Sequence, residues 1–160
     1  MRLSEALTAK REAVLERWFQ AVLATYPQDT ARFLAGVGDA FANPVGHTLR
    51  DGLGRLFDAV AADVPATDLS AAIDGIVRIR AVQEFAPSAA VGFVYALKGI
   101  LREELAGSAI DAAGLAVVEN GVDRLALVAF DVYMQCREKI FEIRVREIKE
   151  SQLLAARLGS

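Results

Sequence analysis

The side chain best suited to acid–base or metal chemistry is His47, the single histidine in the 160 residues. It lies in the stretch FANPVGHTLRDGLGRLF, one turn after an Asn-Pro pair. A zinc site needs several ligands, and one histidine with one distant cysteine does not supply them. A haem iron needs only one proximal histidine, so a haem or small-ligand sensor using the His47 region remains an alternative. We expect His47 to flank a helix–helix contact, with no bound metal and no cofactor.

Glycines surround this histidine in a segment that the sequence predicts to be helical. Gly46, Gly52 and Gly54 each cost roughly 1 kcal/mol of helix stability relative to alanine, so each needs a compensating reason. Close approach of another helix or of a ligand would supply one. Arg50 lies beside His47 on the same side of the predicted helix and is a second candidate for ligand binding or signal coupling.

Two polar residues, Arg80 and Gln83, fall on the apolar face of a third predicted helix. That face is defined by Leu69, Ala72, Ile73 and Ile76. Arg78 points about 200° away from Arg80, toward Asp74 and the polar side. A guanidinium keeps its charge, so a buried Arg80 needs a carboxylate, helix-end carbonyls, a bound anion or a wet interface around it.

This polar pair has two interpretations. The structural one is an ion pair between Arg80 and a nearby acid such as Glu84, or a side chain that reaches the edge of the core. The functional one is anion recognition or signal coupling by Arg80 and Gln83 in a cleft. We predict that Arg80 is buried and paired and that Arg78 lies on a solvated face.

The other reactive residue types give no enzyme signature, and we assign no catalytic residues. The sequence shows no nucleophile–base pairing, no phosphate-binding glycine loop and no zinc motif. Cys136 falls in an apolar seam, which is typical of an inert core thiol. Glu103 and Glu104 come just before the end of a predicted helix and are expected to be ordinary surface residues.

The elements that must position these residues are all helical, because no segment shows sustained period-two alternation. Capping residues and prolines predict five main helices. They run from Ser4 to about Tyr26, from Pro44 to about Ala62, over roughly 68–85, from the APSAA cap to Leu105, and from about Ala112 into the tail. We expect a single-domain, all-α bundle with a core of about residues 4–136 and a projecting C-terminal helix of about 137–158.

The last of these helices predicts self-association. Its first apolar stripe is a heptad-like seam of Leu115, Val118, Val122, Leu125, Ala129, Val132 and Cys136. A second stripe of Leu127, Phe130, Met134 and Phe141 indicates burial on two faces. The apolar residues continue into the charged segment REKIFEIRVREIKE, where a projecting helix needs a partner. We predict a homodimer whose interface includes Val132, Ile140, Phe141, Val145 and Ile148.

Composition limits the setting in which the chain works. Hydrophobic residues make up 54%, charged residues 24%, and the net charge is −3, which disfavours nucleic-acid binding because that needs a basic face. The longest uncharged stretch, Phe85–Leu97, is well short of the ~20 residues that span a bilayer, so we expect no membrane span. A single cysteine suits a reducing compartment, and we expect a cytoplasmic protein.

Three separated segments carry a family resemblance. FANPVGHTLRDGL, IVRIRAVQEFAPSAAVGFV and DRLALVAFDVYMQCREKIFEIRVREIK resemble the N-terminal domain family of RsbT co-antagonist RsbRD proteins. The resemblance implies a stressosome-type sensory module: helical, globin-related, usually without haem, dimeric, and acting through a regulatory protein partner. In multidomain relatives a projecting helix leads to a STAS domain, and none lies within these 160 residues. Some stand-alone members accompany membrane redox complexes of anaerobic sulfur metabolism, so an accessory role of that kind is a further alternative.

Overall fold

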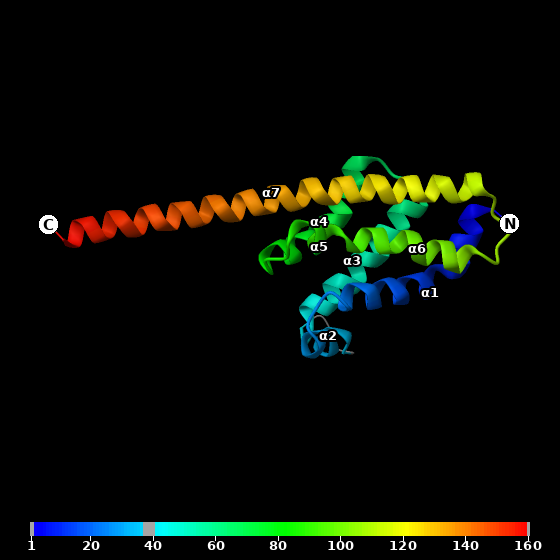
Figure 1. The fold of residues 1–160 in the computed structure, drawn as a ribbon, viewed down its shortest axis with the longest axis horizontal. Coiled ribbons are helices and arrows are strands. Elements are labelled where there is room, and N and C mark those ends of the chain that lie inside the picture. Colours follow the sequence, from blue (N-terminus) through cyan, green and yellow to red (C-terminus); the bar gives the residue numbers. More distant parts are fainter. Residues whose placement is uncertain (1, 37–40, 160) are drawn as a thin grey trace.

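The computed structural model describes residues 2–36 and 41–159, and these form seven α-helices in one all-α domain (Figure 1). The predicted fold class and the long C-terminal helix are therefore confirmed, whereas the number of helices is larger than five. The helices are α1 (Leu3–Leu23), α2 (Gln28–Ala35), α3 (Pro44–Ala61), α4 (Ala66–Val82), α5 (Pro87–Val91), α6 (Phe93–Leu105) and α7 (Ala112–Leu158).

One of the two additional helices is α2, and the other arises after α4. The helix predicted from the APSAA cap to Leu105 is divided at Gly92 into the short α5 and the longer α6. The third predicted helix also ends earlier than expected, at Val82, because Glu84 adopts the left-handed backbone conformation with a φ of 61°. A non-glycine residue in that region stops a right-handed helix. Residues 83–86 therefore form a connection, which we call the α4–α5 turn.

The N-cap predicted from the Asn-Pro pair is confirmed, whereas the start predicted at Ser4 is wrong. At the start of α3, the side-chain oxygen of Asn43 accepts a hydrogen bond of 3.1 Å from the backbone N–H of Gly46, as the Asn-Pro pair predicts. Ser4, by contrast, lies inside α1 and does not cap it. The helix starts one residue earlier, where the backbone N–H of Arg2 donates to the carboxylate of Glu5 at 3.2 Å.

The core forms where α1 packs on α3 and α6, and where α4 packs on α3 and α7. Trp18 of α1 is fully buried, and its indole N–H donates a hydrogen bond of 2.8 Å to the carbonyl oxygen of Phe93 at the start of α6. A buried indole needs such a partner, so this bond fixes α1 against α6.

The predicted close approach at the α3 glycines is observed. A Cβ atom built on Gly52 would lie 2.8 Å from the side chain of Ile76 in α4, and one built on Gly46 would lie 2.5 Å from the carbonyl oxygen of Leu34 in α2. Real Cβ atoms do not come that close to other heavy atoms, because tightly packed interiors leave no such overlap. The glycines therefore let α2 and α4 pack directly on the α3 backbone.

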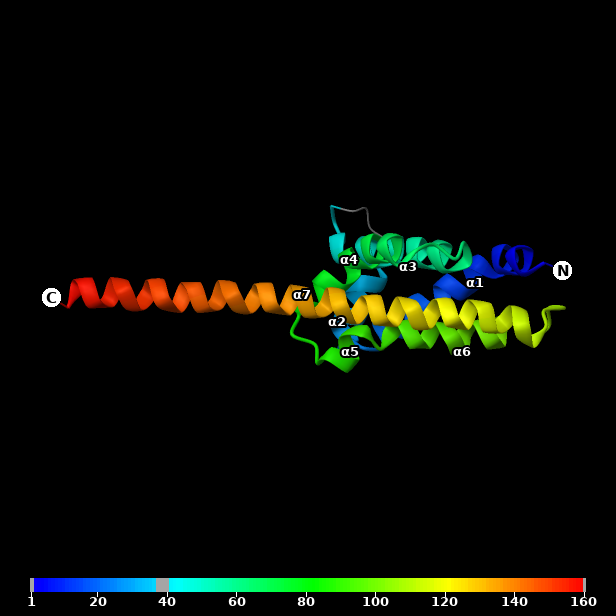
Figure 2. The same cartoon turned by 90° about the horizontal axis from the view of Figure 1, so that it is seen from above.

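Helix α7 runs along the body and then extends beyond it (Figures 1 and 2). Its buried residues end at Tyr133, and nearly all of the later ones are exposed. The prediction that its middle is buried on two faces is wrong within one chain. Leu127 is 68% exposed, and Phe130 and Met134 are also among the exposed large hydrophobic side chains. The core of the domain covers only one side of the helix.

Candidate functional site

Arg80 is one of the largest side chains with no solvent exposure, as the apolar face of α4 predicts. Its Nε atom donates to the carbonyl oxygen of Ala90 at 2.8 Å, and Nη2 donates to the carbonyl oxygen of Ala89 at 2.7 Å. Both Nη atoms also lie 3.2 Å from the hydroxyl oxygen of Thr25. The buried guanidinium is thus paired with main-chain carbonyls and a hydroxyl.

The position of these carbonyls explains how a buried arginine is stabilised without a carboxylate. Ala89 and Ala90 are at the C-terminal end of the five-residue α5, and the last carbonyls of a helix have no partner within it. They also carry the negative end of the helix dipole, which favours a cation. Of the alternatives left open by the sequence, helix-end carbonyls are the correct one. The predicted partner Glu84 instead accepts a hydrogen bond of 2.8 Å from Arg144.

Aromatic rings complete the surroundings of the guanidinium. Its central carbon lies 4.2 Å from the ring centroid of Phe85, 5.3 Å from that of Phe93 and 5.6 Å from that of Tyr26. Such distances allow cation–π attraction, which is stronger where water is excluded. Burial lowers the pKa of Arg80 from its ordinary value, but an arginine stays charged near neutral pH. We call Arg80, Thr25, Tyr26, Phe85 and Phe93 the Arg80 cluster.

Gln83 lies at the edge of this cluster and not within it. It follows the last residue of α4 and is exposed, because the helix on which its position was predicted has already ended. Its side-chain oxygen accepts a hydrogen bond of 2.8 Å from the hydroxyl of Tyr26. The structure therefore brings Gln83 and Arg80 into contact with the same tyrosine.

Helix α7 contacts the end of α4 and the α4–α5 turn through three residues, one or two helical turns apart. The hydroxyl of Tyr133 donates to the carbonyl oxygen of Phe85 at 2.6 Å. One helical turn later, Arg137 donates to the carbonyl oxygen of Ala81 at 3.1 Å. Two turns further along, Arg144 binds Glu84. The turn that borders the Arg80 cluster is therefore attached to the helix that leaves the domain.

The α3 candidates do not join this cluster. His47 is exposed, which gives it none of the enclosure that a haem group requires around its proximal ligand. Arg50 is also exposed, and its guanidinium lies 3.8 Å from the ring centroid of Phe19 and 3.4 Å from the carboxylate of Glu16. A shallow cleft of about 270 Å³ beside Arg50 is lined by Glu12, Leu15, Glu16, Phe19, Arg50 and Leu53.

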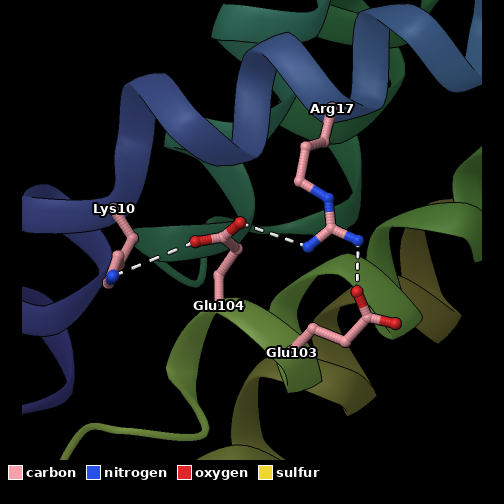
Figure 3. A network of polar contacts seen from close by, with 4 residues as sticks. All are labelled: Lys10, Arg17, Glu103 and Glu104. Carbon is pink, nitrogen blue, oxygen red and sulfur yellow. Dashed lines mark hydrogen bonds and ion pairs between the residues drawn. The ribbon is translucent and has the colours of Figure 1, made fainter.

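The paired carboxylates near the end of α6 take part in a surface network (Figure 3). Arg17 of α1 binds both of them, Glu103 through a short contact and Glu104 at 3.2 Å, and Lys10 lies 3.9 Å from Glu104. The hydrogen bond that Arg17 donates to the carboxylate of Glu103 raises the pKa of Arg17. Exposed ion pairs contribute little to stability, so this network mainly fixes how α1 lies on α6. Nowhere in residues 2–36 and 41–159 do three metal-ligating side chains gather as a metal ion needs.

The predicted interface residues lie on different sides of α7. Val132 is only 4% exposed and belongs to the core, so its assignment to an interface is wrong. Its position in the heptad-like seam already indicated this. Ile140 is half-buried and lines a cleft of about 330 Å³ between α4 and α7, together with Asp74, Arg78, Val82, Gln135, Cys136, Lys139 and Ile143.

The remaining candidates belong to an apolar side of α7 that faces away from the core and is interrupted in its middle by Arg137 and Glu138. It consists of Leu127, Phe130, Met134, Phe141, Val145 and Ile148, and we call it the outer stripe. Val145 is half-buried, and the other five are among the exposed large hydrophobic side chains, with Phe141 67% exposed. Monomeric proteins rarely expose apolar surface of this extent.

Sequence reasoning missed most of the Arg80 cluster. It placed Arg80 on the right face. Thr25 and Tyr26, however, lie in the turn after α1, and Phe93 begins α6, so Arg80 contacts them only through the tertiary fold. The contact between the α4–α5 turn and Tyr133 was also not predicted. The one available signal was the aromatic content of the segments that follow α1 and α4, and it did not indicate which aromatic residue meets which.

The architecture defines a class: a compact helical domain whose last helix extends beyond it and carries unpaired apolar residues. Residues 12–148 match the RsbT co-antagonist protein rsbRD N-terminal domain, and the chain belongs to that family. It is also 29% identical over 144 residues to an uncharacterized protein of Archaeoglobus fulgidus, covering 89% of this chain and 87% of the relative.

The relationship to globins was expected from the family resemblance, and the lack of a membrane span was expected from composition; both can be compared with these findings. No solved structure matches the chain, so a relationship to globins stays a prediction. In the described part of the chain, no helix is long and apolar enough to cross a membrane.

Proposed function

We propose that this chain is a non-catalytic sensory or regulatory domain that signals through protein–protein contacts and dimerises through α7. The observation that carries the proposal is the outer stripe. It lies on a 47-residue helix whose first half packs on the core and whose second half extends beyond it. A helix outside a core is stabilised by packing its apolar face against something. A second copy of the chain supplies that surface.

A non-catalytic role is supported by the state of the polar groups. Arg80 is a charged side chain with no exposure to solvent, and it donates hydrogen bonds to carbonyl oxygens of the domain itself. A substrate therefore has no access to it. Cys136 is half-buried, and burial raises the pKa of its thiol, which lowers the fraction of reactive thiolate at neutral pH.

Signal transmission is supported by the connection between the Arg80 cluster and α7. The α4–α5 turn contacts Arg80 through the ring of Phe85, and it contacts α7 through Tyr133 and Arg144. A ligand or regulatory protein that alters the packing of α5 on Arg80 would shift this turn. The shift would change how α7 leaves the domain, which a partner bound to α7 can detect.

The mass of the protein in solution tests the proposal. We expect light scattering to give the dimer mass at micromolar concentrations, and a monomer mass throughout that range would refute dimerisation. Phe141→Glu should shift the protein toward monomer, because it places a charge in the outer stripe. Leu153→Glu is the matched control, since this exposed leucine lies about 120° further around the helix.

Truncation after Cys136 provides an independent test. It removes Phe141, Val145 and Ile148 from the outer stripe and leaves every fully buried residue of α7 in place. We expect the truncated protein to keep the circular dichroism spectrum of a folded helical domain and to lose most of its self-association. Unchanged association would place the interface elsewhere on the domain.

A further inference from the structure

The cleft of about 330 Å³ between α4 and α7 is charged at one end. Arg78 and Asp74 line this end from α4, and Lys139 lines it from α7, one turn after Cys136. All three charges lie close enough to Cys136 to act on its thiol, although burial has the larger effect on the thiol pKa and raises it. The cysteine therefore marks the point where the charges of the two helices meet.

Lys139 supplies the charge of this end that has no counter-ion. Arg78 and Asp74 bind each other, with distances of 3.1 and 2.9 Å from Nη2 of the arginine to the two carboxylate oxygens. Within residues 2–36 and 41–159, the ammonium group of Lys139 makes no ion pair with a carboxylate. Because Arg78 and Asp74 neutralise each other, the charged end has an excess of positive charge, which favours an anion.

The other end of the cleft is apolar and accessible to solvent. Val82 lies one turn beyond Arg78 on α4 and is 66% exposed, and Ile143 lies one turn beyond Lys139 on α7 and is 44% exposed. Ile140, which is half-buried, completes this end. A hydrocarbon chain laid on these side chains would remove their apolar surface from water, which is favourable.

The dimensions of the cleft limit its occupant to a small molecule. Its volume is at the lower end of the range of about 300–1,000 Å³ that is usual for small-molecule sites. Its lining residues on α4 extend from Asp74 to Val82, which is about 12 Å at 1.5 Å per residue. An extended medium-chain carboxylate has a comparable length and carries its charge at one end, whereas a peptide helix needs a longer groove.

We propose that this cleft binds a small anionic amphiphile, a medium-chain carboxylate, with its charged group on Lys139 and its hydrocarbon chain against Val82 and Ile143. The carboxylate accepts a charge-assisted hydrogen bond from the lysine ammonium. Arg78 uses only Nη2 to bind Asp74, so its other N–H donors can also reach the bound carboxylate.

The position of the cleft connects it to α7. The buried residues of α7 end at Tyr133, and its lining residues follow within 135–143, where the helix leaves the body (Figure 2). A ligand in the cleft contacts α4 on one side and α7 on the other, so its binding stabilises one angle between the two helices. The cleft alone carries the binding site, but its use as a signal input rests on the sensory function proposed above.

Alkylation of Cys136 reports on the cleft, because this residue lines it and is the single cysteine of the chain. We expect decanoate, below the concentration at which it forms micelles, to slow the reaction of iodoacetamide with Cys136 in a saturable manner. Decylamine has the same chain with a positive head group and should need at least about tenfold more for half-protection, because it lacks the charged hydrogen bond to Lys139. Equal protection by both compounds, or no saturable protection by decanoate, overturns the proposal.

Substitutions of two lysines on α7 test the position of the carboxylate. Lys139→Glu should raise the decanoate concentration for half-protection at least about tenfold. Lys149→Glu makes the same change of charge at an exposed position outside the cleft and should leave that concentration almost unchanged. Each variant is compared with and without decanoate, since the substitution itself alters the reactivity of the thiol. Protection of the Lys139→Glu variant at the wild-type concentration overturns the proposal.

Val82→Ser tests the contact with the hydrocarbon chain. This residue is exposed at the end of α4, so the variant should keep the circular dichroism spectrum of the folded domain. Protection by decanoate should weaken several-fold, because the side chain that covers the hydrocarbon becomes polar. Unchanged protection would show that the chain does not lie in the cleft, and the proposal would be wrong.

The Phe141→Glu variant separates this inference from the proposed dimer. Phe141 belongs to the outer stripe and lies about 200° around α7 from Lys139, so decanoate should still protect Cys136 in this variant. Retained protection in a protein that light scattering shows to be monomeric supports a site within one chain, whether or not the wild-type protein dimerises. Loss of protection would place the site between two copies and overturn the inference while the dimer stands.

Discussion

Phe85 is bound from two sides, by the hydroxyl of Tyr133 on its carbonyl oxygen and by the guanidinium of Arg80 on its ring. The first contact comes from α7 and the second from α4. Because Phe85 lies between two helices and within neither, its position depends on both contacts. The α4–α5 turn is therefore the place where a change inside the domain and a change in the direction of α7 meet.

Replacing Arg80 should destabilise the domain far more than replacing Arg78. Arg80→Ala leaves the carbonyls of Ala89 and Ala90 without their donors and creates a cavity between the aromatic rings. The expected loss is roughly 3–5 kcal/mol of unfolding free energy, by analogy with large-to-small core substitutions. Arg78 binds Asp74 on an exposed face of α4, so Arg78→Ala should change stability by no more than about 0.5 kcal/mol.

Urea denaturation followed by circular dichroism checks both values. Arg80→Lys serves as a further comparison, since lysine keeps the charge but cannot bridge two carbonyls with a planar fork. We expect it to recover only part of the loss. If Arg80→Ala and Arg78→Ala are equally stable, water replaces Arg80 as the hydrogen-bond donor to these carbonyls at little cost in free energy.

Gly52→Ala should destabilise the protein, although alanine is the better helix former. The new methyl group would lie 2.8 Å from Ile76 in α4, and overpacking of this kind costs about 1–3 kcal/mol. Gly99→Ala in α6 is the matched control, because no heavy atom lies within 4 Å of its added Cβ atom. That variant should gain about 0.5–1 kcal/mol. Thermal denaturation of the two variants in parallel would reveal whether Gly52→Ala lowers the melting temperature and Gly99→Ala raises it.

Cys136 should make the domain less stable at alkaline pH. Burial raises the pKa of its thiol above the ordinary value, so the folded protein holds this proton when the unfolded chain has already released it. The group has no effect on stability below the ordinary thiol pKa. As the pH rises past that value, the unfolded state is favoured increasingly until the raised pKa is reached.

Two measurements test this behaviour of Cys136. The wild-type protein should lose more stability between neutral and alkaline pH than Cys136→Ser does. The rate of alkylation by iodoacetamide should also rise at a higher pH for the native protein than for the chain in urea. Identical alkylation profiles would mean that the thiol is solvated in the native state.

His47→Ala should leave the fold and its stability almost unchanged. The side chain is exposed on α3, and substitutions at such positions usually alter unfolding free energy by no more than about 0.5 kcal/mol. The absorption spectrum of the purified protein should lack a Soret band. A stoichiometric haem or metal that disappears in this variant would restore the ligand-sensor interpretation.

Local sequence signals were sufficient for the features that depend on neighbours in the chain. The Asn43 cap, the glycines at the contacts of α3, and the face of α4 that carries Arg80 all follow from spacing and backbone chemistry. The burial of α7 was different. Its two apolar stripes look alike in sequence, and only the packing of α4 and α6 decides that Val132 enters the core while Phe130 does not.

The interruption between α5 and α6 was beyond local reasoning for a related reason. The segment around Gly92 has the composition of one continuous helix. The carbonyl oxygen of Ala90, two residues before Gly92, accepts a hydrogen bond from Arg80, which is ten positions earlier in the sequence. The same is true of the Arg80 cluster, which combines residues separated by more than 50 positions. Periodicity predicts which way a side chain points, but it does not predict which distant residue it meets.

The continuity of α7 has a mechanical consequence. Beyond Cys136 the helix adds 22 residues without interruption, which corresponds to a stiff arm of about 33 Å. A tilt of about 10° at the body would displace the tip of such an arm by about 6 Å, given its length at 1.5 Å per residue. In a flexible chain of equal length, changes in the backbone torsion angles would absorb that displacement before it reached the tip. A small change in the direction of α7 at the body thus becomes a movement as large as a side chain at the tip of the helix.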